Sequence, residues 1–505
     1  MSHAVVIGSG FGGLASAIRL ARLGYKTTIL EAGAMAGGRA RVFEQDGFRF
    51  DAGPTVVTAP HLFDELFELW GKNREEYVKF VPVDPFYRCS FSDGSHFDYV
   101  GDEERLLEQI AQLSPVDVRG YQKLVEHSKR IFAIGYTQLA DQPFGKLSDM
   151  LRIVPDLARL SAYRSVYGLV ASHIRDERLR QVFSFEPLLV GGNPMRVPGI
   201  YLLIHWLERK WGVHYALGGT FAIVSALVRL LDEVGVELRL NSPVEEIEVV
   251  AGRAQAVRLL NGDRVQADVI VSNADPTIVY SKMLKAAGLK KNSPEKVTKK
   301  RQSMSLFVGY FGTNKTYPAT RHHTIIMGQR YKGLLQDVFD RKTLADDFSL
   351  YLHRPGASDP NMAPANKEAF YVLSPVPNQQ SGIDWEERQS AYFDAILKVL
   401  EERELPGLTS HLETRFAVDP RYFQGELRSQ HGAAFGLEPI MTQSAYFRYH
   451  NRCSEVSGLY FVGASTHPGA GLPGVLCSAK VMERVVERPR LSPSRIKPVP
   501  SLAVQ

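Results

Sequence analysis

Two glycine-rich segments at opposite ends of the chain constrain its fold more than any other feature. Near the N-terminus an apolar stretch runs into Gly8, Gly10 and Gly13, spaced as G-x-G-x-x-G, and an amphipathic segment follows to about residue 23. A strand, a tight glycine turn and a helix in this order bind the pyrophosphate of a dinucleotide, because phosphate can approach a backbone that carries no side chain. The sequence therefore predicts a nucleotide-binding α/β fold.

A second predicted strand, residues 26–30, ends at Glu31. An acidic residue at this distance from the glycine turn can hydrogen-bond a ribose hydroxyl, and it disfavours a phosphorylated ribose. The cofactor is therefore expected to be FAD or NAD rather than NADP.

The C-terminal segment, residues 456–479, contains no Lys, Arg, Asp or Glu and is long enough to cross a membrane. Its five glycines, with Pro468 and Pro473, would break such a helix and leave backbone groups that lipid cannot satisfy. We instead expect a strand at 459–462, a glycine-rich loop, and a helix from about 473 to 487 whose positive end faces a ligand.

The segments after Glu31 favour FAD over NAD. Gly37, Gly38 and Arg39 follow the acid closely, and the planar guanidinium of Arg39 suits a pyrophosphate. A short strand at 48–51 then enters a Gly-Pro turn at 53–54, where the backbone could pass close to a ring system.

Together these motifs resemble those of the bacterial-type phytoene desaturases, the FAD-dependent carotenoid dehydrogenases, over roughly residues 3–487. The segments that carry the resemblance include Gly8–Gly13, 37–39, 51–55, 191–194, 272–275 and 466–475. The resemblance implies an α/β fold: a Rossmann-like FAD-binding domain, of the flavin amine oxidase or glutathione reductase type, interrupted by a helical membrane-associating region and an α+β substrate domain. With the motifs, it assigns FAD binding to Gly8, Gly10, Gly12, Gly13, Glu31, Gly38, Arg39, Gly53, Pro54, Thr55, Val244, Gly463, Ala464, Gly474 and Val475.

A chain of 505 residues is too long for one core, so several domains are expected. The FAD-binding parts are placed at 1–75, 216–275 and 451–487, a mainly helical insertion at 76–215, a substrate-binding domain at 276–450, and a disordered, basic, proline-rich tail at 488–505. With 60 basic and 55 acidic residues, nothing indicates a nucleic-acid partner. Three cysteines without metal spacing argue against a disulfide framework, and the strand directly after Met1 leaves no room for a signal peptide.

The resemblance implies stepwise desaturation of phytoene to neurosporene or lycopene, with hydride transfer to flavin N5 and with quinone or oxygen as the electron acceptor. The number of steps, the acceptor and any homo-oligomer stay open. A paralogous carotenoid flavoenzyme would share every FAD motif: a hydroxy- or methoxyneurosporene desaturase, an isomerase or a saturase. A carotenoid carrier that binds flavin without redox chemistry is a more distant alternative.

Acid or base residues are harder to place. Asp149 and Arg152 lie three apart on a predicted helix and could project into an apolar tunnel, Asp149 accepting a proton and Arg152 orienting substrate. The same spacing is common in exposed ion pairs. His322 and His323 lack a partner motif for metal binding, so no metal is expected.

Phytoene is a water-insoluble C40 hydrocarbon, so the resemblance also implies peripheral attachment to the cytoplasmic side of a membrane. We expect the contact at residues 153–174, where Tyr163, Arg164 and Tyr167 alternate with apolar residues. Residues 200–207 are a second candidate, although a buried helix explains that stretch slightly better.

Overall fold

The computed structural model describes residues 1–285 and 288–489. One half is built on a five-stranded parallel sheet in the order β19-β13-β1-β2-β9. Its strands are β1 (His3–Ile7), β2 (Lys26–Leu30), β9 (Glu237–Arg239), β13 (Val269–Ser272) and β19 (Leu459–Phe461). The predicted strand at 26–30 is confirmed, and the strand expected at 459–462 is one residue shorter.

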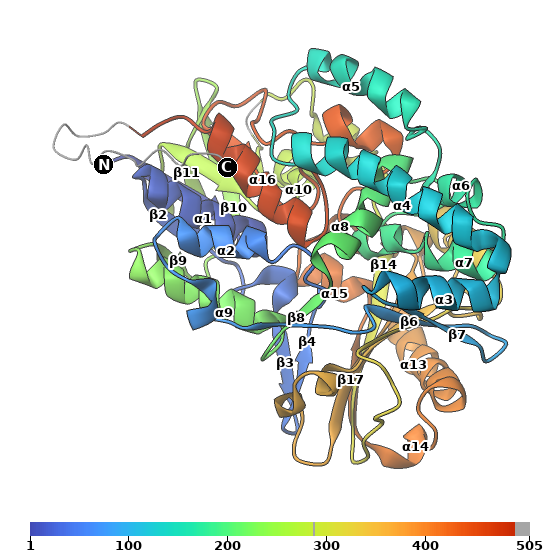
Figure 1. Ribbon diagram of the computed structural model, residues 1–505. Coiled ribbons are helices and arrows are strands. Elements are labelled where there is room, and N and C mark those ends of the chain that lie inside the picture. The colour runs from blue at the N-terminus through green and yellow to red at the C-terminus, as the bar shows by residue number, and fades with distance from the viewer. Residues whose placement is uncertain (286–287, 490–505) are drawn as a thin grey trace.

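Both faces of this sheet are covered, which is why its inner strands are nearly continuous apolar runs. One face carries α1 (Phe11–Leu23), α2 (His61–Glu68), α9 (Thr220–Glu233) and α16 (Leu472–Val485). The other face carries an antiparallel sheet of β10 (Val244–Val250), β11 (Arg253–Leu259) and β12 (Arg264–Gln266). Along β1, Val6 packs with the helices and Val5 with the antiparallel sheet. In Figure 1, α1 from the N-terminus and α16 from the C-terminus lie side by side.

Residues 103–211 are mostly helical. They form α3 (Glu103–Leu113), α4 (Val118–Phe132), a π-helical turn (Ala133–Gln138), α5 (Leu147–Arg159), α6 (Val166–Ala171), α7 (Glu177–Val182) and α8 (Leu203–Trp211). α5 lies at the edge of the molecule, at the top of Figure 1.

A seven-stranded sheet forms the other half, in the order β18-β14-β17-β16-β15-β6-β7. Its strands are β6 (Tyr87–Ser90), β7 (His96–Tyr99), β14 (Ser305–Thr313), β15 (His323–Ile326), β16 (Leu350–His353), β17 (Glu368–Val376) and β18 (Leu412–Val418). One face packs on α13 (Trp385–Arg403) and α14 (Leu408–His411). The other face belongs to the largest apolar cluster of the described residues.

Strand alternation places the two faces of β14 in different surroundings. Phe307 packs against the helical layer, and its neighbour Val308 belongs to the cluster on the opposite face. Shorter helices complete the fold: α10 (Pro276–Ile278), α11 (Pro294–Thr298), α12 (Tyr331–Gln336) and α15 (Pro420–Gly425).

β6 and β7 differ from the expected domain division. They belong to the stretch predicted as a mainly helical insertion, yet β6 pairs in parallel with β15 of the substrate-side sheet. The two insertions therefore share one sheet. Two further antiparallel pairs lie beside these sheets: the hairpin of β3 (Val42–Gln45) and β4 (Phe48–Asp51), and the pair of β5 (Phe80–Pro82) and β8 (His214–Ala216) from distant parts of the chain.

Among the described residues, no helix is long and apolar enough to cross a membrane. The charge-free C-terminal segment is a strand, a loop and a helix, as the sequence predicted. The tail predicted to be disordered lies, from residue 490 onward, outside the described residues.

Candidate active site

The glycine turn after β1 lies open to a large cavity. Gly8 adopts a left-handed backbone conformation with φ of 90°. A Cβ atom on Gly13 would lie 2.0 Å from the carbonyl oxygen of Gly8, so the third glycine is required for the helix to pack against the strand. A Cβ atom on Gly10 would lie 2.7 Å from Nδ2 of Asn273, which follows β13 and lies across the turn. Only small groups fit between this turn and Asn273.

Glu31 is buried at the end of β2, beside the glycine turn. Its Oε2 accepts hydrogen bonds from the backbone N–H of Ser9 at 2.8 Å and from the Ser9 hydroxyl at 2.6 Å. Its Oε1 accepts from the N–H of Gly33 at 2.8 Å. These bonds fix the carboxylate at the cavity wall, where a ribose hydroxyl would reach it.

Arg39 is a half-buried cation at the opposite side of the turn, and its Nε atom is fully buried. One guanidinium nitrogen donates to the Ser429 hydroxyl at 2.8 Å, and Nε has no hydrogen-bond partner among the described residues. Burial lowers the pKa of Arg39, and the charge of Asp275 acts in the opposite direction. A desolvated guanidinium with a free N–H favours an anion nearby, so this side chain fits a pyrophosphate in the cavity.

The turn after β4 brings backbone to the middle of the cavity. A Cβ atom on Gly53 would lie 2.0 Å from the carbonyl oxygen of Arg39, so the two chain segments touch here. The Thr55 hydroxyl lies 2.9 Å from the hydroxyls of both Tyr351 and Tyr371 on the seven-stranded sheet. These contacts link the nucleotide-side turn to the sheet that forms the opposite wall.

The C-terminal loop closes the same cavity. Gly463 follows β19, has φ of 102°, and donates its N–H to the Ser478 hydroxyl at 2.9 Å. Gly474 and Val475, in the first turn of α16, line the cavity, so the positive end of this helix faces it. His467 does not line the cavity; its ring contacts the carbonyl oxygen of Gln142 at 3.1 Å, and burial lowers its pKa to about 4.

All the residues predicted to bind the cofactor, except Gly13, line one cavity of about 1410 Å³. This volume exceeds the roughly 300–1,000 Å³ of ordinary ligand pockets, which leaves space for a second ligand beside a dinucleotide. The remaining walls are mostly apolar and come from α8, the seven-stranded sheet and the residues after α15.

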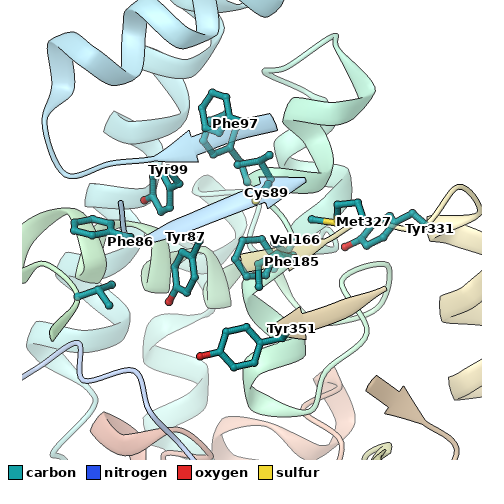
Figure 2. Packing of buried hydrophobic residues seen from close by; sticks show 14 of the residues in the cluster. Phe86, Tyr87, Cys89, Phe97, Tyr99, Val166, Phe185, Met327, Tyr331 and Tyr351 are labelled. Atoms are coloured by element: carbon teal, nitrogen blue, oxygen red, sulfur yellow. The ribbon is translucent and has the colours of Figure 1, made fainter. Parts of the chain in front are cut away.

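Aromatic and aliphatic side chains form this apolar chamber. Phe185, Tyr87 and Tyr351 come from distant segments and belong to one buried cluster, as Figure 2 shows; the rings of Tyr87 and Phe185 lie 5.4 Å apart. On α8, Leu203, Ile204 and Leu207 face the cavity. The stretch at 200–207 is therefore a cavity wall, in agreement with the buried-helix interpretation of the sequence.

A buried carboxyl interrupts the apolar wall. Glu208 of α8 lines the cavity, and its Oε1 accepts a hydrogen bond from the Tyr87 hydroxyl at 2.7 Å. Its Oε2 and both oxygens of its neighbour Glu186 lack hydrogen-bond partners among the described residues. Burial raises the pKa of both carboxyls well above the usual range, and for Glu208 the charge of Glu186 adds to this effect. Each carboxyl therefore keeps its proton to a higher pH than an exposed glutamate does.

Asp149 and Arg152 lie elsewhere. Asp149 accepts a hydrogen bond from the backbone N–H of Lys146 at 3.1 Å and so caps the start of α5. Arg152 is exposed on the same helix, and neither residue lines the cavity. Sequence reasoning missed Glu208 and Asn273. The only signals were that Glu208 is the one acidic residue of α8, and that Asn273 lies inside the segment 272–275 that carries the family resemblance.

The glycine turn, Glu31, Arg39 and the C-terminal loop together form a dinucleotide-binding cradle, and this cradle opens into the apolar chamber. A site of this kind is typical of a flavin-dependent oxidoreductase. The family model for flavin-containing amine oxidoreductases matches residues 11–481. The chain is 47% identical to phytoene desaturase (lycopene-forming) of Pseudescherichia vulneris, over 95% of this chain and 98% of that protein. It is 43% identical to phytoene desaturase (neurosporene-forming) of Rhodobacter capsulatus, over 96% and 94% of the two chains. The chain belongs to the bacterial phytoene desaturases within the flavin-containing amine oxidoreductase family, and its cofactor is FAD.

Solved structures agree with this fold. An oxidoreductase from Methanosarcina mazei matches with a TM-score of 0.65 at 16% identity, over 95% of this chain and all of that chain. Putrescine oxidase bound to putrescine matches with a TM-score of 0.61 at 14% identity, over 96% and 97% of the two chains. At such low identity these structures establish the fold alone.

Substitution of Gly10 by alanine tests the cradle. The new methyl group would meet only the movable end of Asn273, so the protein should fold, but it would occupy the space through which phosphate approaches. We expect at least a tenfold loss of bound FAD, measured as the ratio of flavin to protein absorbance. Gly145→Ala is the control, since a Cβ atom there has no neighbour within 4 Å. Normal FAD content in Gly10→Ala would contradict this assignment.

The Glu186 and Glu208 pair should make stability depend on pH. Because their pKa values are raised on folding, protonation favours the folded state; this contribution is complete below the unfolded pKa of about 4.3 and is lost as pH rises through the folded values. Relative to the wild type, the Glu186→Gln/Glu208→Gln variant should therefore gain thermal stability as pH increases from 6 to 9. If the difference in melting temperature between the variant and the wild type stays constant from pH 6 to 9, the two carboxyls are not desolvated.

Proposed function

We propose that this protein desaturates phytoene in FAD-dependent steps to neurosporene or lycopene. The observation that carries the proposal is the single cavity in which a dinucleotide cradle opens directly into an apolar chamber. The names of the relatives at 43–47% identity support the same substrate. A chamber without hydrogen-bonding groups along most of its wall suits a hydrocarbon, because burial of apolar surface is its main source of affinity.

Each desaturation removes a hydride from one methylene and a proton from its neighbour, and the two carbons form a double bond. Bound FAD supplies the hydride acceptor, at flavin N5. The chain supplies the rest: the apolar walls hold the polyene and exclude water, and the first turn of α16 offers free N–H groups toward the cofactor.

Glu208 is the proposed proton acceptor. It is the buried carboxyl on the apolar wall, Tyr87 fixes one of its oxygens, and the other oxygen is unpartnered among the described residues. When the Glu186 and Glu208 pair holds a single proton, the remaining carboxylate is a stronger base than it would be in water, because its surroundings do not solvate the charge.

Incubation of the FAD-loaded protein with phytoene in liposomes tests the function. New long-wavelength absorption bands are expected as conjugation lengthens, and their position gives the number of steps. Activity with neurosporene or a hydroxylated relative, but none with phytoene, would favour a paralogous carotenoid flavoenzyme. Anaerobic assays with and without a quinone would distinguish quinone from oxygen as the electron acceptor.

Glu208→Gln should reduce turnover by about 10²–10⁴-fold, the usual contribution of a general base, while FAD content stays unchanged. Glu126→Gln, on the exposed side of α4, is the control. Asp149→Asn gives the decisive comparison. If Asp149 were the proton acceptor, this variant would lose as much turnover as we expect for Glu208→Gln. Full activity of Glu208→Gln would remove Glu208 from the reaction.

We propose peripheral attachment to a membrane through α5. Leu147, Leu151 and Val154 occur at helical spacing on one face of this helix and are 52%, 63% and 43% exposed. Tyr163, Met441 and Phe447 are also exposed, and α5 packs against the turn Ala445–Phe447. We call these six residues the α5 patch. Its exposed basic neighbours are Lys146, Arg152, Arg159 and Arg164.

An exposed apolar face bordered by cations is typical of a helix that lies in the membrane interface and contacts anionic lipid. The observed patch starts earlier than the predicted contact at 153–174. Tyr163 and Arg164 are exposed as expected, but Tyr167 is buried and its hydroxyl donates to Glu177 at 2.7 Å.

Replacement of Leu147, Leu151 and Val154 by serine should lower sedimentation with anionic liposomes by at least tenfold, since each buried aliphatic side chain contributes roughly 1.5–3 kcal/mol. The control variant carries serine at Val116, Val250 and Leu260, which are equally exposed but lie on other elements. Equal binding by the two variants would contradict attachment through the α5 patch.

A further inference from the structure

Three histidines converge at one edge of the strand pair β15 and β16, near Asp51 at the end of β4. His323 begins β15 and lies directly opposite His353 at the end of β16, and His322 precedes β15. All three side chains are buried. The nitrogen atoms that they offer lie within 4.8 Å of one another, and their ring centroids are 4.4–5.4 Å apart.

The rings of His322 and His323 each have one nitrogen in a hydrogen bond and one nitrogen without a partner among the described residues. Nδ1 of His323 lies 2.7 Å from the Tyr351 hydroxyl, and Nδ1 of His322 lies 2.8 Å from the Ser358 hydroxyl. Nε2 of His322, Nε2 of His323 and both ring nitrogens of His353 have no hydrogen-bond partner among the described residues. Four unpaired polar atoms in one buried place are costly, which indicates that a ligand satisfies them.

The surroundings favour a cation at this point. The carboxylate of Asp51, also buried, lies 3.8 Å from Nε2 of His353. Other charges nearby are already neutralised: Arg354, which follows His353, pairs with Glu368 at 2.5 Å.

We propose that His322, His323 and His353 bind one divalent transition-metal cation, of which zinc is the best match, with Asp51 balancing its charge. Imidazole nitrogens suit zinc, copper and iron rather than magnesium or calcium. Hydrogen bonds from Nδ1 to Tyr351 and Ser358 are the kind that orient metal-binding histidines. Zinc–nitrogen bonds of about 2.0–2.1 Å require the nitrogens to lie roughly 3.4 Å apart in a tetrahedron, so small side-chain rotations complete the site.

This site does not depend on the proposed function, because none of the three histidines lines the cavity; Asp51 is the residue that the two places share. Its effect is structural. The ion would join the strand pair β15 and β16 to Asp51 of β4, and so hold the substrate-side sheet against the cofactor-side turn. Tyr351 shares both places: its hydroxyl bonds His323 and Thr55.

The test uses the full, FAD-loaded chain purified without a metal-affinity tag. Its metal content is measured by mass spectrometry as isolated, after chelation, and after titration with Zn²⁺ alone. We expect one equivalent of metal and a higher melting temperature with Zn²⁺ than after chelation. X-ray absorption at the zinc edge should show three nitrogen ligands at about 2.0–2.1 Å. If no ion binds and the melting temperature stays constant, or if the ligand set lacks three nitrogens, the proposal is wrong.

The His353→Gln variant should contain at least tenfold less zinc than the wild type, while its FAD absorbance stays unchanged. His173→Gln is the matched control: His173 is half-buried in a pair with His127, with 3.1 Å between their ring nitrogens, and that variant should keep its zinc. Retention of one equivalent by His353→Gln would overturn the assignment. If that variant does not fold, the ligand set measured on the wild type decides the question.

Discussion

The register of the five-stranded parallel sheet is the constraint on which the cofactor site depends. Ile7 lies opposite both Leu30 and Ser272, and Ser272 lies opposite Phe461. β1 and β2 are close in the sequence, whereas β13 and β19 lie hundreds of residues further on. The chain continues from each of these strands into a part of the cofactor site: the glycine turn, Glu31, Asn273 or the C-terminal loop. Since a slip of one residue reverses every side chain in a strand, the apolar pairing of these strands also fixes the positions of the polar groups beyond them.

Two arginines that are removed from solvent differ in whether a carboxylate neutralises them, and this difference distinguishes a structural ion pair from a ligand-binding residue. Arg19 is buried in the helical layer, but Glu65 and Glu483 each lie 2.7 Å from it and neutralise its charge. Arg39 is half-buried, its Nε is buried without a hydrogen-bond partner, and among the described residues its side chain bonds only the Ser429 hydroxyl. Desolvation without a counter-charge is unfavourable, so such a group persists where a bound ligand completes it. The pyrophosphate of FAD is the anion that we expect at Arg39.

Much of the cofactor cradle could be predicted because its requirements are local. A glycine that must approach phosphate and an acidic residue at the end of a strand can both be recognised in the sequence, because the residues that define them lie within a few tens of positions of one another. Glu208 left no such pattern, because its role arises from the tertiary contacts that bury it beside Glu186 and Tyr87. The spacing of Asp149 and Arg152 correctly placed them on one helix, but the direction of that helix face is set by packing.

Pairing between distant segments explains the other differences between sequence and structure. β6 and β7 come from a stretch that is otherwise mostly helical, and only their pairing with β15 places them in the large sheet. His353 is likewise separated from His322 and His323 in the sequence but lies opposite His323 in the sheet. Hydrophobic periodicity predicts the type of an element well, but it carries no information on which distant strand will be its neighbour.

An apolar chamber is also consistent with the different products that are named for similar relatives. The relatives named as lycopene-forming and neurosporene-forming are each more than 40% identical to this chain over nearly its full length. A polyene offers no polar group for recognition, and a single methylene contributes only about 1–3 kcal/mol in an apolar pocket. Under the proposed function, the number of steps is therefore set by the length and shape of the walls contributed by α8 and the seven-stranded sheet, while the cradle stays the same.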